Sequence, residues 1–458
     1  MSDIASSNGS PRKACIIGAG SSGIAAAKTL RERGIPYDCF EIGSGIGGMW
    51  RYNNDNGRSS AYKSLHINTS RDTMAYSDFP LPRDWVPFPD HEHVLKYFES
   101  YVDHFGFRDT ITFRTTVEKV EPAESGDPHP AQAGNGDWDV TVVGPDGQRR
   151  TNRYGAVLVA NGHHWSPRKV TYPGEFHGQQ MHSHDYRTPE MLIDKRVLVV
   201  GFGNSSCDIA CESSRVAEAT FFSVRRGAHV IPKYMFGWAM DTILPKFIWR
   251  ILPWWAIRPI FAFGLRLARG EMSWYGLPQP EHGVLQEHPT ISADLFNVIG
   301  HGNLGIKPNV QELCGDSVRF VDGSVEKIDL IVWCTGYNIS FPFLDGQIID
   351  PLNNEISLYQ QVVHPDRPGL YFIGLVQPWG ATMPLAEAQS KWVADVLTGQ
   401  SGLPPRDEML AEIQRHQAEI AKRYTKSVRH TIQVDFFPYQ SLLTKTSRRG
   451  RRWPKRPL

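Results

Sequence analysis

The sequence predicts an α/β protein built around two Rossmann-like nucleotide-binding units. The apolar run Ala14–Ile17 leads into the glycine-rich turn Gly18–Gly23, and an Ala-rich helical pattern follows. Farther along, the apolar run Arg196–Val200 leads into a second glycine-rich turn, Gly201–Ser206, which is again followed by a helical pattern. Strand, glycine turn and helix in this order are typical of a dinucleotide site. A chain of 458 residues is also too long for one core, so more than one domain is expected.

The first unit has the features that a bound dinucleotide requires. Gly18 permits a tight turn, Gly20 lets the backbone approach a pyrophosphate, and Gly23 lets the helix pack closely on the strand. The helix N-terminus then presents free N–H groups to the phosphates. A second apolar run, Tyr37–Phe40, ends in Glu41, which is placed to bind ribose hydroxyls. The predicted contacts are therefore Gly18, Ala19, Gly20, Ser21, Ser22, Gly23 and Glu41.

The second unit departs from this pattern in two places. Its third glycine position is occupied by Ser206, whose side chain is expected to loosen the packing of helix on strand. The strand Thr220–Val224 ends in Arg225 and Arg226, where an acidic residue is usual. Arginine pairs with a 2′-phosphate that a carboxylate repels, so this unit is predicted to bind NADPH rather than NADH. The alternative is a solvated arginine pair after an edge strand. The predicted contacts are Gly201, Gly203, Asn204, Ser205, Ser206, Asp208, Arg225 and Arg226.

The rest of the chain mixes helical and strand patterns. Residues His66–Pro89 are rich in Pro and aromatics and have no period, and a loop of this length in a compact domain is usually functional. Helical spacing of apolar residues predicts helices at His91–Phe105, Leu385–Leu397 and Arg406–Arg423. Strands are predicted at Ile111–Glu121, Trp138–Val143, Tyr154–Ala160, Ser317–Phe320, Ile328–Cys334 and Leu370–Leu375.

Composition excludes several classes of function. The net charge of +1 gives no sign of a nucleic-acid partner. No charge-free apolar run reaches the length of a transmembrane helix, and the polar N-terminus does not resemble a signal peptide. Six cysteines without a C-x-x-C pair indicate buried reduced thiols, so a cytoplasmic location is expected. The neighbouring histidines His163-His164 and His182/His184 lack zinc spacing, so no metal site is predicted.

Two nucleotide units in one chain suggest a hydride donor and a carrier. Nicotinamide delivers a hydride and flavin is its usual partner. Disulfide reductases place a C-x-x-C beside the flavin, and this sequence has none. Oxygen is therefore the expected electron acceptor.

An ordered set of motifs resembles the flavin-containing monooxygenases, which are relatives of the type I Baeyer–Villiger monooxygenases. Phe176-x-Gly178-x-x-x-His182-Ser183-x-x-Tyr186 is similar to the family fingerprint and stands between the two glycine turns. The other matching stretches are Gly47–Trp50, Asn68-Thr69-Ser70 followed by Tyr76–Pro80, Cys334–Tyr337, Phe372–Gly374 and Glu387-x-Gln389. The likeness runs from about Lys13 to about Gln440.

This resemblance implies that an NADPH domain is inserted into an FAD domain. The implied FAD domain comprises residues 1–175 and 336–445, and the NADPH domain comprises 176–335 with a helical insert at about 236–300. Residues 446–458 are expected to form a basic disordered tail. The implied FAD contacts include Gly48, Met49, Trp50, Asn68, Thr69, Gln377, Glu387 and Gln389. The implied NADPH contacts include His182, Tyr186, Thr335, Gly336 and Tyr337.

The resemblance also implies a reaction. NADPH reduces FAD, O2 adds to give a C4a-hydroperoxyflavin, and a small amine or sulfide takes one oxygen atom. Asn68 is the predicted catalytic residue, because an amide can hydrogen-bond the peroxide without a titrating proton. Baeyer–Villiger oxidation of ketones, an NADPH oxidase and a non-catalytic flavin protein stay as alternatives. The Trp-rich segment Phe236–Leu267 is expected to be a cap over the active site, a membrane-interface helix or a subunit contact, and a homodimer is left open.

Overall fold

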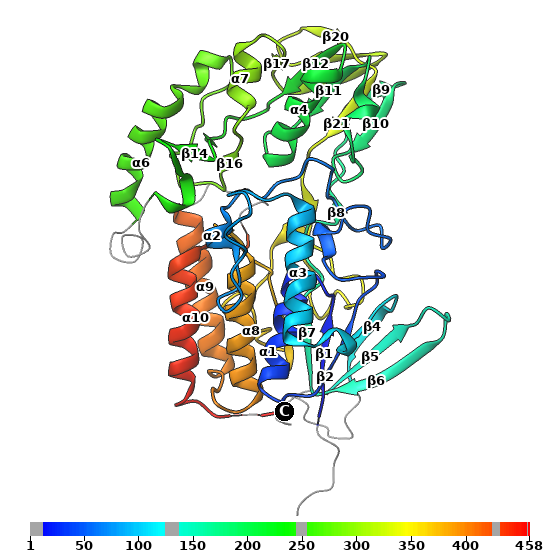
Figure 1. Ribbon diagram of the computed structural model, residues 1–458, viewed down its shortest axis with the longest axis vertical. Helices are drawn as coiled ribbons and strands as arrows, with labels where there is room; N and C mark the ends of the chain where they lie inside the picture. The colour runs from blue at the N-terminus through cyan, green and yellow to red at the C-terminus, as the bar shows by residue number, and fades with distance from the viewer. Residues whose placement is uncertain (1–11, 124–136, 244–253, 424–430, 456) are drawn as a thin grey trace, which may run out of the picture.

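The computed structural model describes residues 12–123, 137–243, 254–423, 431–455 and 457–458. Two α/β domains are stacked along the long axis of the molecule (Figure 1). The lower one, here the terminal domain, contains the elements up to β8 and from β22 onward. The upper one, here the inserted domain, contains the elements from β9 to β21. The two Rossmann-like units predicted from the glycine turns are thus confirmed.

The terminal domain has three layers. Its central parallel sheet has the order β23 (Leu370–Phe372), β7 (Ala156–Val159), β1 (Ala14–Ile17), β2 (Tyr37–Phe40) and β3 (Ile111–Thr112). All four residues of β1 are buried, because helices cover one face and a meander covers the other. The helices are α1 (Ser21–Glu32), α3 (His91–Phe105), α8 (Met383–Leu397) and α10 (Phe436–Gly450). The meander is β4 (Thr116–Pro122), β5 (Trp138–Val143) and β6 (Arg149–Tyr154).

The inserted domain has its own parallel sheet and core. The sheet order is β10 (Gln179–His182), β21 (Leu330–Trp333), β11 (Arg196–Val200), β12 (Ala219–Ser223) and β17 (Gly305–Lys307). Helices α4 (Asn204–Val216) and α7 (Leu295–Gly300) pack beside it. A second sheet consists of β20 (Val325–Lys327), β19 (Ser317–Phe320), β18 (Val310–Gly315) and β9 (Gly174–Phe176). The chain enters through β8 (Ser166–Pro167) and leaves through β22 (Tyr337–Asn338), which pair as an antiparallel ribbon.

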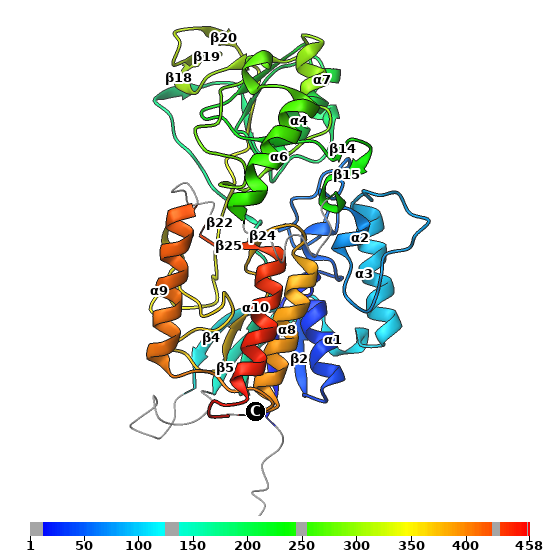
Figure 2. The same cartoon turned by 90° about the vertical axis from the view of Figure 1, so that its left-hand side faces the viewer.

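The segment predicted as a helical insert is in fact mixed. Two short strands, β14 (Tyr234–Met235) and β15 (Trp238–Ala239), form a hairpin that is followed by the helical turn η4 (Met240–Thr242). Helix α6 (Trp254–Arg269) follows, and residues 244–253 lie outside the described part. The paired strands β13 (Val230–Ile231) and β16 (Thr290–Ile291) enclose this stretch. In Figures 1 and 2, α6 lies at the junction of the domains, above the upper ends of α8 and α10.

The prediction of a disordered tail is wrong for the described residues. Helix α10 continues to Gly450, and the backbone N–H of Leu458 donates to Leu397 O at 2.9 Å. The backbone N–H of Gly402 likewise bonds to Gly450 O at 2.8 Å. The end of the chain therefore packs against the C-terminus of α8, which a reading of charge and proline content alone misses. Figure 2 shows α8, α10 and α9 (Arg406–Arg423) as neighbouring columns of the terminal domain.

Local deviations from the predicted elements have simple causes. The strand predicted at Ile111–Glu121 is broken into β3 and β4 because Arg114 adopts a positive φ of 52°. Helix α1 begins at Ser21, before the Ile24 at which the Ala-rich pattern predicts its start, because the glycine turn passes directly into the first helical turn. Among the residues that the structure describes, no helix has both the length and the apolar character needed to cross a membrane.

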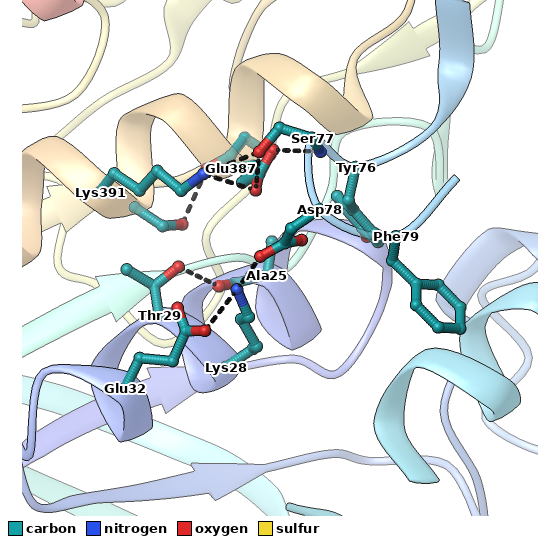
Figure 3. A network of polar contacts seen from close by, with 12 residues as sticks. Ala25, Lys28, Thr29, Glu32, Tyr76, Ser77, Asp78, Phe79, Glu387 and Lys391 are labelled. Atoms are coloured by element: carbon teal, nitrogen blue, oxygen red, sulfur yellow. Dashed lines mark hydrogen bonds and ion pairs between the residues drawn. The ribbon is translucent and has the colours of Figure 1, made fainter. Parts of the chain in front are cut away.

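A polar network fixes the 76–79 stretch between α1 and α8 (Figure 3). The Lys28 side chain on α1 is only 2% exposed and forms ion pairs with Asp78 and Glu32. On α8, Glu387 accepts hydrogen bonds from Ser77 N and Oγ, both at 2.8 Å, and from Lys391 Nζ at 2.7 Å. These contacts explain what Ser77 and Asp78 do in the fold: they fasten the middle of the long 66–89 loop to two helices.

Candidate functional site

A cavity of about 900 Å³ lies between the two domains. It opens at the carboxyl ends of β1 and β2, where open α/β sheets commonly bind ligands. The terminal domain lines it with the first glycine turn, and the inserted domain lines it with Asn204 and Ser205. Apolar residues of the 230–291 stretch complete the wall; those that the argument uses are Met240, Ile257, Phe261 and Leu285.

The first glycine turn is shaped to receive phosphate groups. Gly18 has φ of +100°, and a Cβ on Gly23 would lie 1.8 Å from Gly18 O. A Cβ on Gly48 would lie 3.1 Å from the Gly20 Cα, so the two loops leave a narrow gap that a side chain would fill. Helix α1 has no side-chain cap and no acidic residue in its first turn. Its N-terminal N–H groups are therefore open to an anion, so that the pyrophosphate contact stays a prediction that this turn could satisfy.

Glu41 is buried at the end of β2 and braces the glycine turn. Its Oε2 accepts from the backbone N–H of Ala19 at 2.7 Å, and its Oε1 accepts from that of Gly43 at 2.8 Å. The residue is 3% exposed and lines the cavity. The carboxylate therefore has a structural task that the sequence did not reveal, in addition to the ribose contact that we predicted.

The stretch Gly47–Trp50 forms the facing wall. The Gly47 N–H donates to Ala19 O at 3.1 Å, which ties this turn to the glycine turn. Gly48, Met49 and Trp50 all line the cavity. Two residues that sequence reasoning missed hold them: Asn54 Nδ2 donates to Gly48 O at 3.0 Å, and Ser59 Oγ donates to Met49 O at 2.7 Å. Both are small polar residues in a polar loop, so no motif marked them.

Asn68 and Thr69 are half-buried and line the cavity. Among the described residues, no hydrogen bond is made by the Asn68 side chain, so its amide is available to a bound group. The flanking residues are firmly held, because Ile67 N donates to Pro89 O at 3.0 Å and Ser70 is bonded on its other side to Asp241. The structure thus brings the predicted catalytic residue to the same cavity as the first glycine turn.

Three residues predicted as FAD contacts stand behind the cavity wall. The Glu387 carboxylate accepts hydrogen bonds from Ser77 and Lys391 (Figure 3). Gln389 is buried, with Oε1 accepting from Gly374 N at 2.7 Å and Nε2 donating to Tyr439 OH at 2.8 Å. Gln377 belongs to β24 (Gln377–Trp379), whose other two residues line the cavity. None of the three lines the cavity, and Gln389 braces the wall through its bond to Gly374.

The second glycine turn places α4 at the same cavity. Gly201 has φ of +131°, and a Cβ there would lie 2.4 Å from Cys334 O. Ser206 does not loosen the unit, because its Oγ both accepts from Gly203 N and donates to Gly203 O at 2.7 Å. Asn204 and Ser205 line the cavity, whereas Gly201, Gly203 and Ser206 shape the turn behind them.

Arg225 and Arg226 are exposed just past the carboxyl end of β12. Neither makes an ion pair with another described residue, so both cations are free for a phosphate. The charge of Arg225, added to the larger effect of burial, lowers the pKa of Arg168. Positive charge is therefore concentrated where the 2′-phosphate of NADPH is predicted, although neither arginine lines the cavity itself.

The remaining predicted NADPH contacts lie at the hinge. His182 Nδ1 accepts from His184 N at 3.0 Å, and its ring meets the edge of Tyr337 at 5.3 Å. Thr335 Oγ1 donates to Arg168 O at 2.6 Å. Gly336 has φ of +84°, which suits the sharp exit from β21. None of these residues lines the cavity, so they connect the domains and do not form its wall.

Tyr186 and Asp208 are anchored to other protein groups. The Tyr186 hydroxyl donates to Glu212, and the Tyr62 hydroxyl donates to Asp208 Oδ2 at 2.5 Å. Burial raises the pKa of Asp208 to about 6. Because Tyr62 belongs to the terminal domain, its bond to α4 is a contact between the domains.

Comparison with known proteins identifies the family of this chain. The chain matches the family described as flavin-binding monooxygenase-like over residues 11–447. It is 39% identical over 439 residues to flavin-containing monooxygenase 5 of Homo sapiens, across 93% of this chain and 80% of that protein. It is 36% identical over 447 residues to flavin-containing monooxygenase 3 of Homo sapiens, across 94% of this chain and 82% of that protein.

Solved structures with the same fold include two oxygenases. S-allyl-L-cysteine S-oxygenase from Allium sativum is 28% identical with a TM-score of 0.71, over 95% of this chain and 88% of that one. Cyclohexanone monooxygenase from Rhodococcus sp. Phi1, bound to NADP+, is 18% identical with a TM-score of 0.71, over 98% of this chain and 100% of that one. At this identity the likeness is one of fold alone. The chain therefore belongs to the flavin-binding monooxygenase-like family and is a monooxygenase that uses FAD and NADPH.

Proposed function

We propose that this monooxygenase transfers one oxygen atom of O2 to the soft nitrogen or sulfur atom of a small molecule. The observation that carries the proposal is the position of Asn68, whose free amide lines one cavity together with the first glycine turn and the apolar residues of the inserted domain. Support for sulfur comes from the S-allyl-L-cysteine S-oxygenase, which has the same fold at 28% identity.

The residues of the cavity suit the two cofactors in separate places. FAD, when bound, supplies the hydride acceptor and the centre at which O2 is activated. We assign its pyrophosphate to the N-terminus of α1, its ribose to Glu41, and the neighbouring wall to Gly48–Trp50 and Thr69. We assign NADPH to the turn before α4, with Arg225 and Arg226 on its 2′-phosphate. The hinge residues His182 and Thr335–Tyr337 then set the angle between the two sites.

Asn68 can serve the oxygen transfer through its amide. The group offers a donor and an acceptor and has no proton that titrates near neutrality. Around it, Met240, Ile257 and Phe261 exclude water, which protects oxygen transfer from a wasteful release of H2O2. Burial in the cavity lowers the pKa of His163 well below its usual range, with a smaller contribution from His164. An uncharged histidine suits a neutral amine or thioether.

The test is the Asn68→Asp variant with a thioether and a cyclic ketone as parallel substrates. We expect anaerobic flavin reduction by NADPH to be unchanged, while sulfoxide per NADPH falls at least about tenfold and H2O2 rises in its place. The matched control is Asn338→Asp, which is exposed and outside the cavity. Undiminished sulfoxide in Asn68→Asp would refute the role of the amide. Lactone without sulfoxide from the wild type would replace the proposed function with Baeyer–Villiger oxidation.

Two further expectations stay predictions. A cytoplasmic location is proposed from the six cysteines, all of which are free thiols in the structure; a fluorescent fusion that sediments with cell membranes would contradict it. A homodimer stays open, as in the sequence, and sedimentation velocity would decide between a monomer and a dimer.

A further inference from the structure

The stretch that carries Asn68 belongs to the terminal domain but is held by the inserted domain. Directly after Asn68 and Thr69, the backbone N–H of Ser70 donates to Asp241 Oδ2 at 2.8 Å, and Ser70 Oγ donates to the same oxygen at 2.9 Å. Thr73 Oγ1 donates to that oxygen as well. Asp241 lies in η4, within the stretch between β15 and α6. One carboxylate oxygen from the inserted domain therefore accepts three hydrogen bonds from residues 67–73, here called the Asn68 loop.

A second contact holds the loop on the other side of Asn68. Lys233 Nζ donates to Ile67 O at 3.0 Å, and the ammonium group lies 5.2 Å from the centre of the Phe88 ring. Ile67 is 1% exposed, so this carbonyl is reached from inside the protein. Both Lys233 and Asp241 line the cavity. The two charged residues of the inserted domain thus bind the chain on either side of Asn68, Lys233 at Ile67 and Asp241 at Ser70.

These bonds differ from the other polar contacts between the domains. Tyr62 and Ser64 donate to Asp208 and Glu212 on α4, several residues before Asn68. Those contacts fix α4 to the terminal domain but do not touch Ile67–Thr73. Charge-assisted bonds are stronger than neutral ones, and those made by Asp241 and Lys233 end on backbone groups and hydroxyls next to Asn68. A shift of the 233–241 segment would therefore move Asn68 directly.

We propose that Asp241 and Lys233 are positioning residues that hold the Asn68 amide at the reacting centre. In this arrangement the Asn68 amide is correctly placed for oxygen transfer only when residues 233–241 of the inserted domain contact the Asn68 loop. The inference rests on the proposed role of Asn68. It adds that the residues which secure the amide come from the opposite domain.

The test compares Asp241→Ala with Asp241→Asn in the FAD-loaded enzyme. Alanine removes the acceptor of three hydrogen bonds, whereas asparagine keeps one oxygen that can accept them. A displacement of about 1 Å in a reacting group can cost up to about a hundredfold in rate. We expect Asp241→Ala to lower sulfoxide per NADPH by about tenfold, to raise H2O2 correspondingly, and to leave the rate of anaerobic flavin reduction within about twofold. Asp241→Asn should restore most of the coupling, which here means the amount of sulfoxide formed per NADPH consumed.

Lys233 is tested in the same way with Lys233→Met and Lys233→Arg. Methionine keeps the aliphatic length and removes the donor to Ile67 O, so uncoupling is expected; arginine keeps a donor and should restore coupling. The matched control is Ser64→Ala, which also breaks a bond between the domains but one that ends on α4. It should stay coupled.

Two outcomes would overturn the inference. One is full coupling in Asp241→Ala while Asn68→Asp is uncoupled, which leaves the proposed function intact and removes the positioning role. The other is an equal loss of flavin reduction and oxygen transfer in Asp241→Ala, which indicates a general failure of domain docking. If Asn68→Asp itself is fully coupled, the proposed function fails separately.

Discussion

At the scale of single residues, Glu41 braces the first glycine turn and is predicted to bind the FAD ribose as well. We predict that Glu41→Ala lowers FAD affinity by about ten- to a hundredfold, because two buried N–H groups lose their acceptor at about 1–3 kcal/mol each and the ribose contact is lost as well. Flavin content after dialysis against a series of free FAD concentrations measures this. Asp38→Ala is the control, because Asp38 lies on the same strand and bonds to Lys13 and Tyr154 instead. Full flavin occupancy of Glu41→Ala would contradict the prediction.

Arg225 concerns the choice between NADPH and NADH. Its exposed guanidinium lies past the end of β12 with no described ion-pair partner. A lost charge-assisted bond to phosphate is worth about 1.5–3 kcal/mol, so Arg225→Ala should raise the KM for NADPH about tenfold or more. The KM for NADH should not change. Steady-state kinetics with both cofactors measure the effect, and Arg215→Ala, an exposed arginine on α4, serves as control. Parallel increases for NADH and NADPH would show that Arg225 does not read the 2′-phosphate.

At the scale of elements, the Lys28 network makes an asymmetric prediction. Lys28 is 2% exposed whereas Asp78 is 37% exposed, so the two partners leave different defects when they are removed (Figure 3). Asp78→Ala leaves the buried Lys28 ammonium with Glu32 as its remaining ion-pair partner. Breaking a buried pair lowers the free energy of unfolding by about 3–5 kcal/mol, and Glu32 offsets part of this loss. Lys28→Met leaves a carboxylate that water can reach, at about 1 kcal/mol. Thermal unfolding should therefore show the larger loss of Tm in Asp78→Ala, and equal losses would contradict the argument.

The elements themselves show where a sequence is informative. Buried strands such as β1 and β11 and the amphipathic α3 were predicted with their bounds, because the period of apolar residues follows directly from the face they bury. The stretch at about 236–300 was predicted as a helical insert, yet it begins with a short strand and a turn before α6. Around its start, Ile231, Met235 and Met240 pack against residues of α6, and such a tertiary contact has no period in the sequence. The ordered C-terminus was missed for the same reason, since its bonds go to Leu397 and Gly402.

At the scale of the whole molecule, the site was predictable where one backbone segment builds it. The first glycine turn and Glu41 were found because spacing along one strand–turn–helix unit fixes their geometry. Asp241 and Lys233 could not be found, because their partners Ser70 and Ile67 lie on the other domain and no local pattern connects them. Glu387 and Gln389 show the converse: a motif pointed to them, and the structure places them one layer behind the cavity.

The contact between Tyr62 and Asp208 joins the two domains and makes the stability of the whole molecule depend on pH. Burial raises the pKa of Asp208 from 3.8 to about 6. Between these values the folded protein keeps a proton that the unfolded chain has released, so stability from this group falls as pH rises from about 4 to about 6. Two pKa units correspond to roughly 3 kcal/mol.

Asp208→Asn removes this titration and still offers Tyr62 an acceptor. The stability of the variant minus that of wild type should therefore be larger at pH 7.5 than at pH 4.5, by roughly 2 kcal/mol. Urea unfolding without NADP+ at both pH values measures the difference, and Glu190→Gln, on an exposed carboxylate of the same domain, is the control. A difference between Asp208→Asn and wild type that is the same at both pH values would mean that Asp208 stays ionised in the folded protein. In that case the domain contact would be an ordinary hydrogen bond to a charged group, and the junction of the domains would lose its sensitivity to pH.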